Sequence, residues 1–473
     1  MKKKYVFKTF RTLNRYYVYD RSTNSIIAIS KEEYDALHEE ERRIDTSGNS
    51  VIMKYQKCGA FLPNIVETIE HPAEKLMTHY LKHRVSHVIL QVTQQCNLRC
   101  EYCSYSGIYD NMREHCNKHM DIVTAKKAID FAINRCGELS RFRISFYGGE
   151  PLLQFGLIKE CVSYAKGKIS GRKLEFGITT NGTLLKEDTI PFLIDNDFNI
   201  SISLDGPKEV HDANRRFSDG RGSFNVIMAN VQSIKKMYPE YAKNMAFLTV
   251  LNPKIDLECV LKYFNTDEIF EDCYIMYNSM SEQGLKEELH YKKKFQLVSN
   301  YEYLKMLFSL IGRLNQKYVS KLMTQTYTNY QRLYNSLTKR SILAKTVHPG
   351  GPCLVGTNRL FVDINGNLYP CERVDENATC FQIGNIYTGF DMEKICHLLN
   401  NAKCTEQECI NCWNLINCKI CTGDIDLGQN KTFTKEKKLL KCKTQKEKML
   451  NDLYELCTLH ELGYQIEQEG IEQ

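Results

Sequence analysis

The pattern of apolar and polar positions predicts alternating strands and helices between residues 87 and 280. Short apolar runs predict buried strands at residues 88–93, 142–147, 174–180, 200–204, 246–251 and 273–277. Amphipathic stretches separate them; in one of these, apolar side chains share a helix face at Ile122, Ala125, Ile129, Ala132 and Ile133. Strand and helix units in series predict an α/β fold, a parallel sheet curled as a partial (β/α)₆ TIM-like barrel.

The first 84 residues follow a different pattern. Alternating apolar residues and a polar turn within residues 5–29 predict two strands joined by a turn. A helix follows, which Ser30 caps with Glu33 as the partner in a capping box. A further helix is expected at residues 74–83. This winged-helix-like module is either a decoration packed on the core or a peptide-docking domain whose strand edge accepts an extended partner.

The remainder of the chain divides into two parts. A polar, Tyr-rich stretch with helical character occupies residues 281–345, and a Cys-rich tail follows. We therefore predict four parts, with these boundaries: a separate N-terminal module at 1–84, the α/β core at 85–280, a helical bridge at 281–345 and a Cys-rich domain at 346–473.

Composition excludes several classes of protein. The 473 residues are 42% hydrophobic and 25% charged, which is typical of a globular chain. The net charge of +6 is small and spread along the sequence, so no nucleic-acid partner is expected. No apolar run reaches the roughly 20 residues of a membrane span, and no apolar stretch follows the basic start as in a secretory signal. A cytoplasmic protein without a membrane partner is expected.

Twenty cysteines in a reducing compartment predict metal binding for those that cluster. Cys96, Cys100 and Cys103 follow the first predicted strand with the spacing C-x₃-C-x₂-C. Three thiolates so spaced hold three irons of a [4Fe–4S] cluster and leave the fourth iron without a protein ligand. About 0.04 such triplets are expected by chance among twenty cysteines, so accident is a poor explanation. Half of a zinc knuckle is the alternative.

Polar residues also follow the next three predicted strands. The second strand ends in a Gly-Gly-Glu-Pro segment at residues 148–151, the third in a polar turn at 179–183, and the fourth in a polar run at 201–215. Glycines let a ligand approach the backbone closely, and Glu150 offers a carboxylate to an ammonium group. Because the carboxyl ends of parallel strands meet at one edge, a site is predicted there, beside the cysteines.

These features resemble the radical S-adenosylmethionine (radical SAM) enzymes over residues 87–278. The resemblance rests on the cysteine loop, the aromatic Tyr102 before its third cysteine, the Gly-Gly-Glu-Pro segment and the spacing of Ser203 and Arg215. It implies that the three cysteines bind the catalytic cluster, and that the amine and carboxylate of S-adenosylmethionine chelate the open iron. Reduction then gives methionine and a 5′-deoxyadenosyl radical.

The resemblance also implies which residues surround the cofactor. Glu150 and the backbone around Gly149 would hold the amine, Ser203 and Arg215 the carboxylate side, and Tyr102 and Leu248 the adenosyl group. The whole implied set is Tyr102, Gly148, Gly149, Glu150, Pro151, Asn181, Ser203, Asp205, Arg215 and Leu248. It assigns no general base.

The cysteines of the tail are similar to the SPASM extension of radical SAM enzymes, which carries two auxiliary [4Fe–4S] clusters. The layout is C-x₁₂-G-x₄-C, then C-x₂-C-x₅-C-x₂-C, then a last Cys. The resemblance implies a nearer cluster on Cys353, Cys371 and Cys421, and a distal cluster on Cys409, Cys412, Cys418 and Cys442. A zinc ribbon is the alternative. The family usually has three residues before Cys421, where this chain has two.

The nearer cluster lacks an obvious fourth ligand after Cys353. Either one of its irons stays open to a substrate thiolate, or a further thiol fills it, from Cys380, Cys396 or Cys404. Three carboxylates, Asp363, Glu372 and Asp424, come near the auxiliary ligands in sequence, and none of them is singled out as a base.

Most enzymes of this type modify peptides or proteins. The resemblance implies a maturase of a ribosomally made precursor peptide, of the ranthipeptide or sactipeptide kind, that joins a Cys sulfur to a carbon as a thioether. The N-terminal module would bind the leader, and flavodoxin or ferredoxin would supply electrons. An anaerobic sulfatase-type formylglycine maturase, a carbon–carbon crosslinking cyclase and a non-catalytic metal-binding scaffold are the alternatives.

Overall fold

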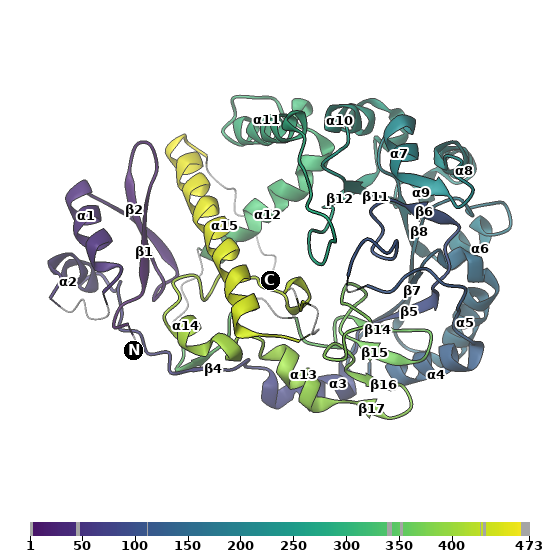
Figure 1. The fold of residues 1–473 in the computed structure, drawn as a ribbon, viewed down its shortest axis with the longest axis horizontal. Helices are drawn as coiled ribbons and strands as arrows, with labels where there is room; N and C mark the ends of the chain where they lie inside the picture. The colour runs from purple at the N-terminus through teal and green to yellow at the C-terminus, as the bar shows by residue number, and fades with distance from the viewer. Residues whose placement is uncertain are drawn as a thin grey trace.

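A ten-stranded sheet organises the larger part of the molecule, with strand order β12-β11-β9-β8-β7-β5-β14-β15-β16-β17 (Figure 1). The structure is a computed structural model that describes residues 3–43, 48–110, 112–337, 343–350, 353–425, 427–428 and 432–464. The six strands that residues 87–279 contribute to this sheet are mutually parallel: β5 (His87–Thr93), β7 (Arg141–Gly148), β8 (Lys173–Thr180), β9 (Phe198–Ser203), β11 (Ala246–Leu251) and β12 (Tyr274–Ser279). All six predicted strands and the predicted α/β fold are confirmed.

Amphipathic helices cover the outer side of these strands (Figure 1). They are α4 (Ile122–Ile133), α5 (Phe155–Lys168), α6 (Ile190–Asp195), α7 (Lys208–Asn214), α8 (Phe224–Met237), α9 (Pro239–Ala242) and α10 (Leu257–Thr266), with η2 (Pro151–Gln154) and η3 (Glu268–Phe270). The predicted helix around residue 129 is α4, where Asp121 accepts a hydrogen bond from the Thr124 amide and so caps the first turn. Its face of Ala125, Ile129 and Ala132 is fully buried against the sheet.

The C-terminal domain extends the sheet beyond β5. Strand β14 (Leu360–Val362) pairs parallel with β5, and antiparallel partners follow in β15 (Asn367–Tyr369), β16 (Gly384–Asn385) and β17 (Gly389–Phe390). These strands have two or three residues each, too few for an apolar pattern to reveal them. No described strand pairs β12 with β17, so the sheet is open and the tail supplies one of its flanks.

The N-terminal module is an antiparallel sheet of three strands, β1 (Phe7–Arg11), β2 (Tyr16–Asp20) and β3 (Ser25–Ile29), where the sequence predicted two. Helices α1 (Lys31–Glu40) and α2 (Ser50–Gln56) follow, and the predicted capping box of Ser30 and Glu33 is present. The module has its own apolar cluster, which includes Phe7, Val18, Leu37 and Phe61. The helix expected at 74–83 forms as η1 (Glu74–Leu76) and α3 (Met77–His83). Met77 and Leu81 pack in the central core.

Helices of the bridge and the tail lie between the module and the large sheet (Figure 1). The predicted bridge is helical, with α11 (Lys293–Leu310), η4 (Gln316–Tyr318), η5 (Lys321–Met323) and α12 (Thr324–Leu337). Phe10, Tyr17 and Tyr19 of the module pack on α12 and on the long helix α15 (Lys435–Glu461). The remaining short elements are β4 (Thr68–Ile69), which pairs with β13 (Thr346–Val347), then α13 (Met392–Leu399), η6 (Lys403–Thr405), α14 (Glu406–Ile410) and η7 (Thr422–Asp424).

One buried arginine joins the module to the tail. The Arg21 side chain donates hydrogen bonds to the carbonyl oxygens of Ile410 (2.7 Å) and Cys412 (3.2 Å) and to Asn64 Oδ1 (2.6 Å). Burial lowers the pKa of Arg21 to about 10, so the side chain stays charged at neutral pH. Among the described residues, no helix combines the length and the apolar character that a membrane crossing requires.

Candidate active site

A cavity of about 490 Å³ opens at the carboxyl ends of the parallel strands. Cys96, Cys100 and Cys103 line it together, as their place after β5 predicts. Other residues of the cysteine loop, of the following strand ends and of β10 share its wall. Those that the sequence had singled out are Tyr102, Gly148, Gly149, Asn181, Ser203 and Arg215. The structure therefore brings most of the predicted cofactor-binding set around the three thiols.

Backbone contacts hold the cysteine loop against the Gly-Gly-Glu turn. The Gly149 amide donates to Thr93 O (3.0 Å) and the Glu150 amide to Gln95 O (2.9 Å). A Cβ atom on Gly149 would lie 2.1 Å from Gln95 O, and one on Gly148 would lie 2.0 Å from Thr93 O. Gly148 also has φ +142°, which favours glycine. Two glycines are thus required for the loop and the turn to meet.

The three thiols fit a [4Fe–4S] cluster by their chemistry. Burial raises the pKa values of Cys96 and Cys100 to about 12 and also raises that of Cys103, so each would need a bound metal to become a thiolate at neutral pH. Backbone amides already point at two of the sulfurs: Leu98 N at Cys96 Sγ and Tyr105 N at Cys103 Sγ, both at 3.4 Å. Such N–H groups stabilise cluster-bound sulfur.

A second group of side chains faces the cysteine loop from β9 and β10 (Arg215–Phe217). Strand β10 pairs with β6 (Leu98–Cys100), which sets Arg215 opposite Cys100. Arg215 Nε lies 3.1 Å from Asp205 Oδ2, and the Tyr102 hydroxyl donates to the same oxygen. Arg215 also lines the cavity, so its guanidinium, paired with Asp205, places a positive charge beside the three thiols.

His211 orders this group, a role that the sequence did not reveal. Its ring is fully buried, accepts from the Asp205 amide at Nδ1 (3.3 Å) and donates from Nε2 to Ser223 Oγ (2.9 Å). Burial lowers the pKa of His211 to about 4, so the ring is neutral, as this pattern of one acceptor and one donor nitrogen requires. The polar segment around His211 contains a single His, and no local pattern predicts that this ring contacts Asp205 and Ser223.

Four predicted residues lie outside the set that lines the cavity: Glu150, Pro151, Asp205 and Leu248. Glu150 is fully buried and accepts from the Thr180 hydroxyl (2.7 Å), the Leu152 amide (3.1 Å) and the Asn181 amide (2.7 Å). Burial raises the pKa of Glu150 to about 7 against these hydrogen bonds. Its carboxylate joins the ends of β7 and β8, and Val250 lines the cavity where Leu248 was expected.

The tail contributes to the same cavity. Cys371 and Cys421 line it, as do Glu372 and Asp424. The pKa of the Cys353 thiol is raised by burial and further by the neighbouring thiols of Cys421 and Cys371, so the predicted nearer trio lies together. Asp363, the third carboxylate near these ligands in the sequence, is not part of the lining. It accepts hydrogen bonds from the amides of Asn365 and Asn367 in its own turn.

The distal cysteines gather in a separate, small cavity beside α15. Its lining includes the four cysteines that the sequence grouped, Cys409, Cys412, Cys418 and Cys442. Burial raises the pKa of Cys442 to about 12, and the other three thiols raise it further against the effect of Lys438. The alternative fourth ligands Cys380, Cys396 and Cys404 line neither thiol cavity.

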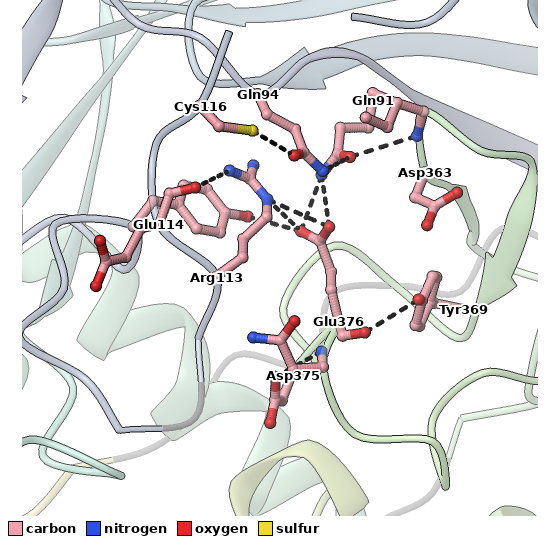
Figure 2. A network of polar contacts seen from close by, with 12 residues as sticks. Gln91, Gln94, Arg113, Glu114, Cys116, Asp363, Tyr369, Asp375 and Glu376 are labelled. Carbon is pink, nitrogen blue, oxygen red and sulfur yellow. Dashed lines mark hydrogen bonds and ion pairs between the residues drawn. The ribbon is translucent and has the colours of Figure 1, made fainter. Parts of the chain in front are cut away.

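A buried polar network ties the cysteine loop to the tail. Figure 2 shows the Arg113 guanidinium and the Gln91 amide converging on the Glu376 carboxylate. Arg113 and Glu376 form an ion pair at 3.1 Å with side chains 8% and 7% exposed. The guanidinium also lies 3.5 Å from the ring centre of Tyr105, whose amide points at Cys103 Sγ. The network thus fixes the loop that carries Cys103 against the segment after Cys371.

Replacing Arg113 by Met is expected to destabilise the protein by about 3 kcal/mol, because it leaves the Glu376 carboxylate buried without its cation. The double variant Arg113→Met with Glu376→Gln should recover most of that loss, since the Gln91 amide still has an acceptor. Urea unfolding followed by circular dichroism gives the free energies. Arg221→Met is the control, because Arg221 and Asp219 form an exposed pair worth less than about 1 kcal/mol. Equal effects of the two single substitutions would contradict the prediction.

Comparison with known proteins agrees with this geometry. Residues 90–265 match the model of the radical SAM superfamily. The chain is 30% identical over 306 residues to an uncharacterised protein of Methanocaldococcus jannaschii, covering 64% of this chain and 89% of that protein. The chain belongs to the radical SAM superfamily, and it is an enzyme of that class, with S-adenosylmethionine and a [4Fe–4S] cluster as the cofactors that the family implies.

Two enzymes with assigned activities and one solved structure are also similar to this chain. The chain is 32% identical over 189 residues to the cysteine-type anaerobic sulfatase-maturating enzyme of Clostridium novyi, covering 39% of this chain and about half (49%) of that enzyme. It is 24% identical over 400 residues to the radical SAM cyclopropyl synthase TigE of Paramaledivibacter caminithermalis, covering 79% and 76%. The solved structure "Native anSMEcpe with bound AdoMet" has the same fold, with a TM-score of 0.57 and 22% identity over 80% of this chain and 100% of the other.

Proposed function

We propose that the protein is a maturase of a ribosomally made peptide that installs a thioether between a Cys sulfur and a carbon atom of the same peptide. One observation carries the proposal: Cys371 and Cys421 line the same cavity as Cys96, Cys100 and Cys103. Cys353 lies beside these two thiols but outside the lining of the cavity. A centre held by Cys353, Cys371 and Cys421 would thus face the reaction chamber, and its fourth position is proposed for a substrate thiolate.

The roles proposed for the chain follow from the geometry. Cys96, Cys100 and Cys103 hold the catalytic cluster, and Arg215 and Ser203 orient the carboxylate of S-adenosylmethionine. Bound and reduced, this pair supplies a 5′-deoxyadenosyl radical as hydrogen-atom acceptor, and the auxiliary centres are suited to take up an electron. Glu150 is proposed to act indirectly on the cofactor site. Its carboxylate accepts hydrogen bonds from Thr180 and Asn181 and so holds the end of β7 to the end of β8.

Glu372 is proposed as the acceptor of the thiol proton. It lines the cavity directly after Cys371, and Arg359 holds its Oε1 at 2.6 Å. Its Oε2 is buried and has no hydrogen-bond partner among the described residues. In the reaction the peptide loses a hydrogen atom from carbon to the 5′-deoxyadenosyl radical, a proton from sulfur to Glu372 and one electron, and the C–S bond forms. The product is lighter than the precursor by two hydrogens.

The N-terminal module is proposed to bind the leader of the precursor. Strand β3 pairs with β2 alone among the described strands, so its other edge can accept an extended segment. The match to the radical SAM cyclopropyl synthase TigE covers 79% of this chain and so extends well beyond the radical SAM core. Likeness to sulfatase-maturating enzymes supports a second candidate, oxidation of one Cys or Ser to formylglycine; carbon–carbon crosslinking is a third outcome of the same radical.

Anaerobic co-expression with candidate Cys-containing precursor peptides, sought among the genes next to this one, tests the proposal. A mass loss of two hydrogens together with the loss of one alkylatable thiol is expected. Oxidation of a Ser gives the same mass loss but keeps every thiol, and oxidation of a Cys to formylglycine loses the sulfur; either result would replace the thioether with the second candidate. Glu372→Gln should lower product formation while S-adenosylmethionine cleavage persists.

A further inference from the structure

A larger polar cavity of about 620 Å³ lies beside the active-site cavity, and the reaction as proposed does not use it. Helices α12 and α15 form much of its wall, together with the end of β12 and the segment after Cys418. Its lining includes hydroxyl, amide and ammonium groups on Tyr277, Tyr303, Asn329, Lys419, Lys441 and Lys448. We call it the lysine cavity. Its volume is within the range of ligand sites, roughly 300–1,000 Å³.

Positive charge prevails in the lysine cavity. Lys441 and Lys448 lie two helical turns apart on one face of α15, and Lys419 approaches from the tail. The carboxylates in the lining are Asp424 and Asp452. Among the described residues, none of the three lysines forms an ion pair within 4.0 Å, whereas Glu455 nearby already accepts from the Tyr303 and Tyr330 hydroxyls. The lining thus carries three ammonium groups against two carboxylates, and Lys448 and Lys419 act on Asp452 only at longer range.

The lysine cavity adjoins the active-site cavity. Asp424 lines both, and on β12 Tyr277 lines the lysine cavity while Asn278 and Ser279 line the other. On its far side, Tyr330, Leu333 and Met449 belong to the apolar cluster on which the N-terminal sheet packs. Figure 1 shows α15 and α12 between that sheet and the strands that end at the active site. A substrate peptide that contacts both the N-terminal module and the active-site cysteines would therefore pass the lysine cavity.

We infer that the lysine cavity binds a carboxylate-bearing segment of the substrate peptide, between the part held by the N-terminal module and the residue that reacts. The inference rests on the proposed function as a peptide maturase. Lysines facing a recess attract Asp or Glu side chains and raise the rate of productive encounter. The amide and hydroxyl groups of Asn329, Thr326 and Gln445 in the same lining suit peptide backbone. A recess continuous with the active site favours a peptide over a protein electron donor, which needs an outer surface.

Fluorescence anisotropy with two labelled synthetic peptides, GSDGDSG and GSNGNSG, tests the inference on the reconstituted protein at low salt. The acidic peptide should bind about tenfold more tightly than its amide counterpart. The triple variant Lys419→Gln, Lys441→Gln, Lys448→Gln should lose that difference. Lys448→Gln should lose part of it, whereas Lys443→Gln, a change of equal charge on the same helix but outside the lining of the cavity, should stay within about twofold of wild type.

Three results would overturn the inference. The first is equal binding of the two peptides by wild type, and the second is a loss in Lys443→Gln as large as in Lys448→Gln. If the lysine variants bind the acidic peptide like wild type but are reduced more slowly by flavodoxin, the lysines serve an electron donor and the inference fails. Mass loss of two hydrogens and loss of one thiol in the co-expressed peptide test the proposed function separately, because they are scored without measuring binding of the two synthetic peptides.

Discussion

Alanine at Cys96, Cys100 or Cys103 is expected to reduce S-adenosylmethionine cleavage to the background rate. Each thiol lines the active-site cavity, and among the described cysteines of the same loop no other lines it. A cluster with two protein ligands is held weakly, and the geometry at the open iron is lost with it. The measurement is 5′-deoxyadenosine formed by anaerobically reconstituted protein with dithionite, together with iron and sulfide content.

Cys116→Ser is the matched control for these variants. Cys116 lies in the same loop region but donates from its thiol to Gln94 Oε1 at 2.9 Å, a hydrogen bond that a serine hydroxyl can also make. This variant should cleave S-adenosylmethionine within about twofold of wild type. Full cleavage activity in any of the three alanine variants, or its loss in Cys116→Ser, would refute the assignment of the catalytic ligands.

Gly149→Ala is expected to have the second large effect, a loss of about 3 kcal/mol or more in the free energy of unfolding. The new Cβ would lie 2.1 Å from Gln95 O and 3.0 Å from Cys96 N, and backbone atoms cannot turn aside as a flexible side chain would. The hydrogen bond from the Gly149 amide to Thr93 O would be strained as well. Urea unfolding and 5′-deoxyadenosine formation should both show the defect, because the displaced segment begins the cysteine loop.

Gly156→Ala provides the comparison for this prediction. Its Cβ meets nothing within 4 Å, and Gly156 lies in α5 on the chain segment that follows the same turn. Alanine is the better helix former, so the variant should be as stable as wild type or more stable by up to about 1 kcal/mol. Should Gly149→Ala unfold at the same urea concentration as Gly156→Ala, the close approach of the turn to the cysteine loop would be wrong.

Local patterns were sufficient to predict the architecture of the core. Strand and helix periodicities depend on neighbours a few residues apart, and β5, β7, β8, β9, β11 and β12 form where the apolar runs stand. The C-x₃-C-x₂-C spacing carries its chemistry within eight residues, and the capping box of Ser30 and Glu33 within four. Because parallel strands end at one edge, even the convergence of Gly149, Asn181 and Ser203 on the cysteines followed from order along the chain.

Contacts between distant segments were decided only by the tertiary structure. Arg113 and Glu376 are separated by 263 residues and Arg21 and Ile410 by 389, and no short-range pattern pairs them. Strands β14 to β17 are too short to be predicted from periodicity, yet the pairing of β14 with β5 carries the tail to the active site. Glu150 joins two strands instead of lining the cavity, and Val250 stands where Leu248 was expected, because burial and side-chain direction are settled by packing.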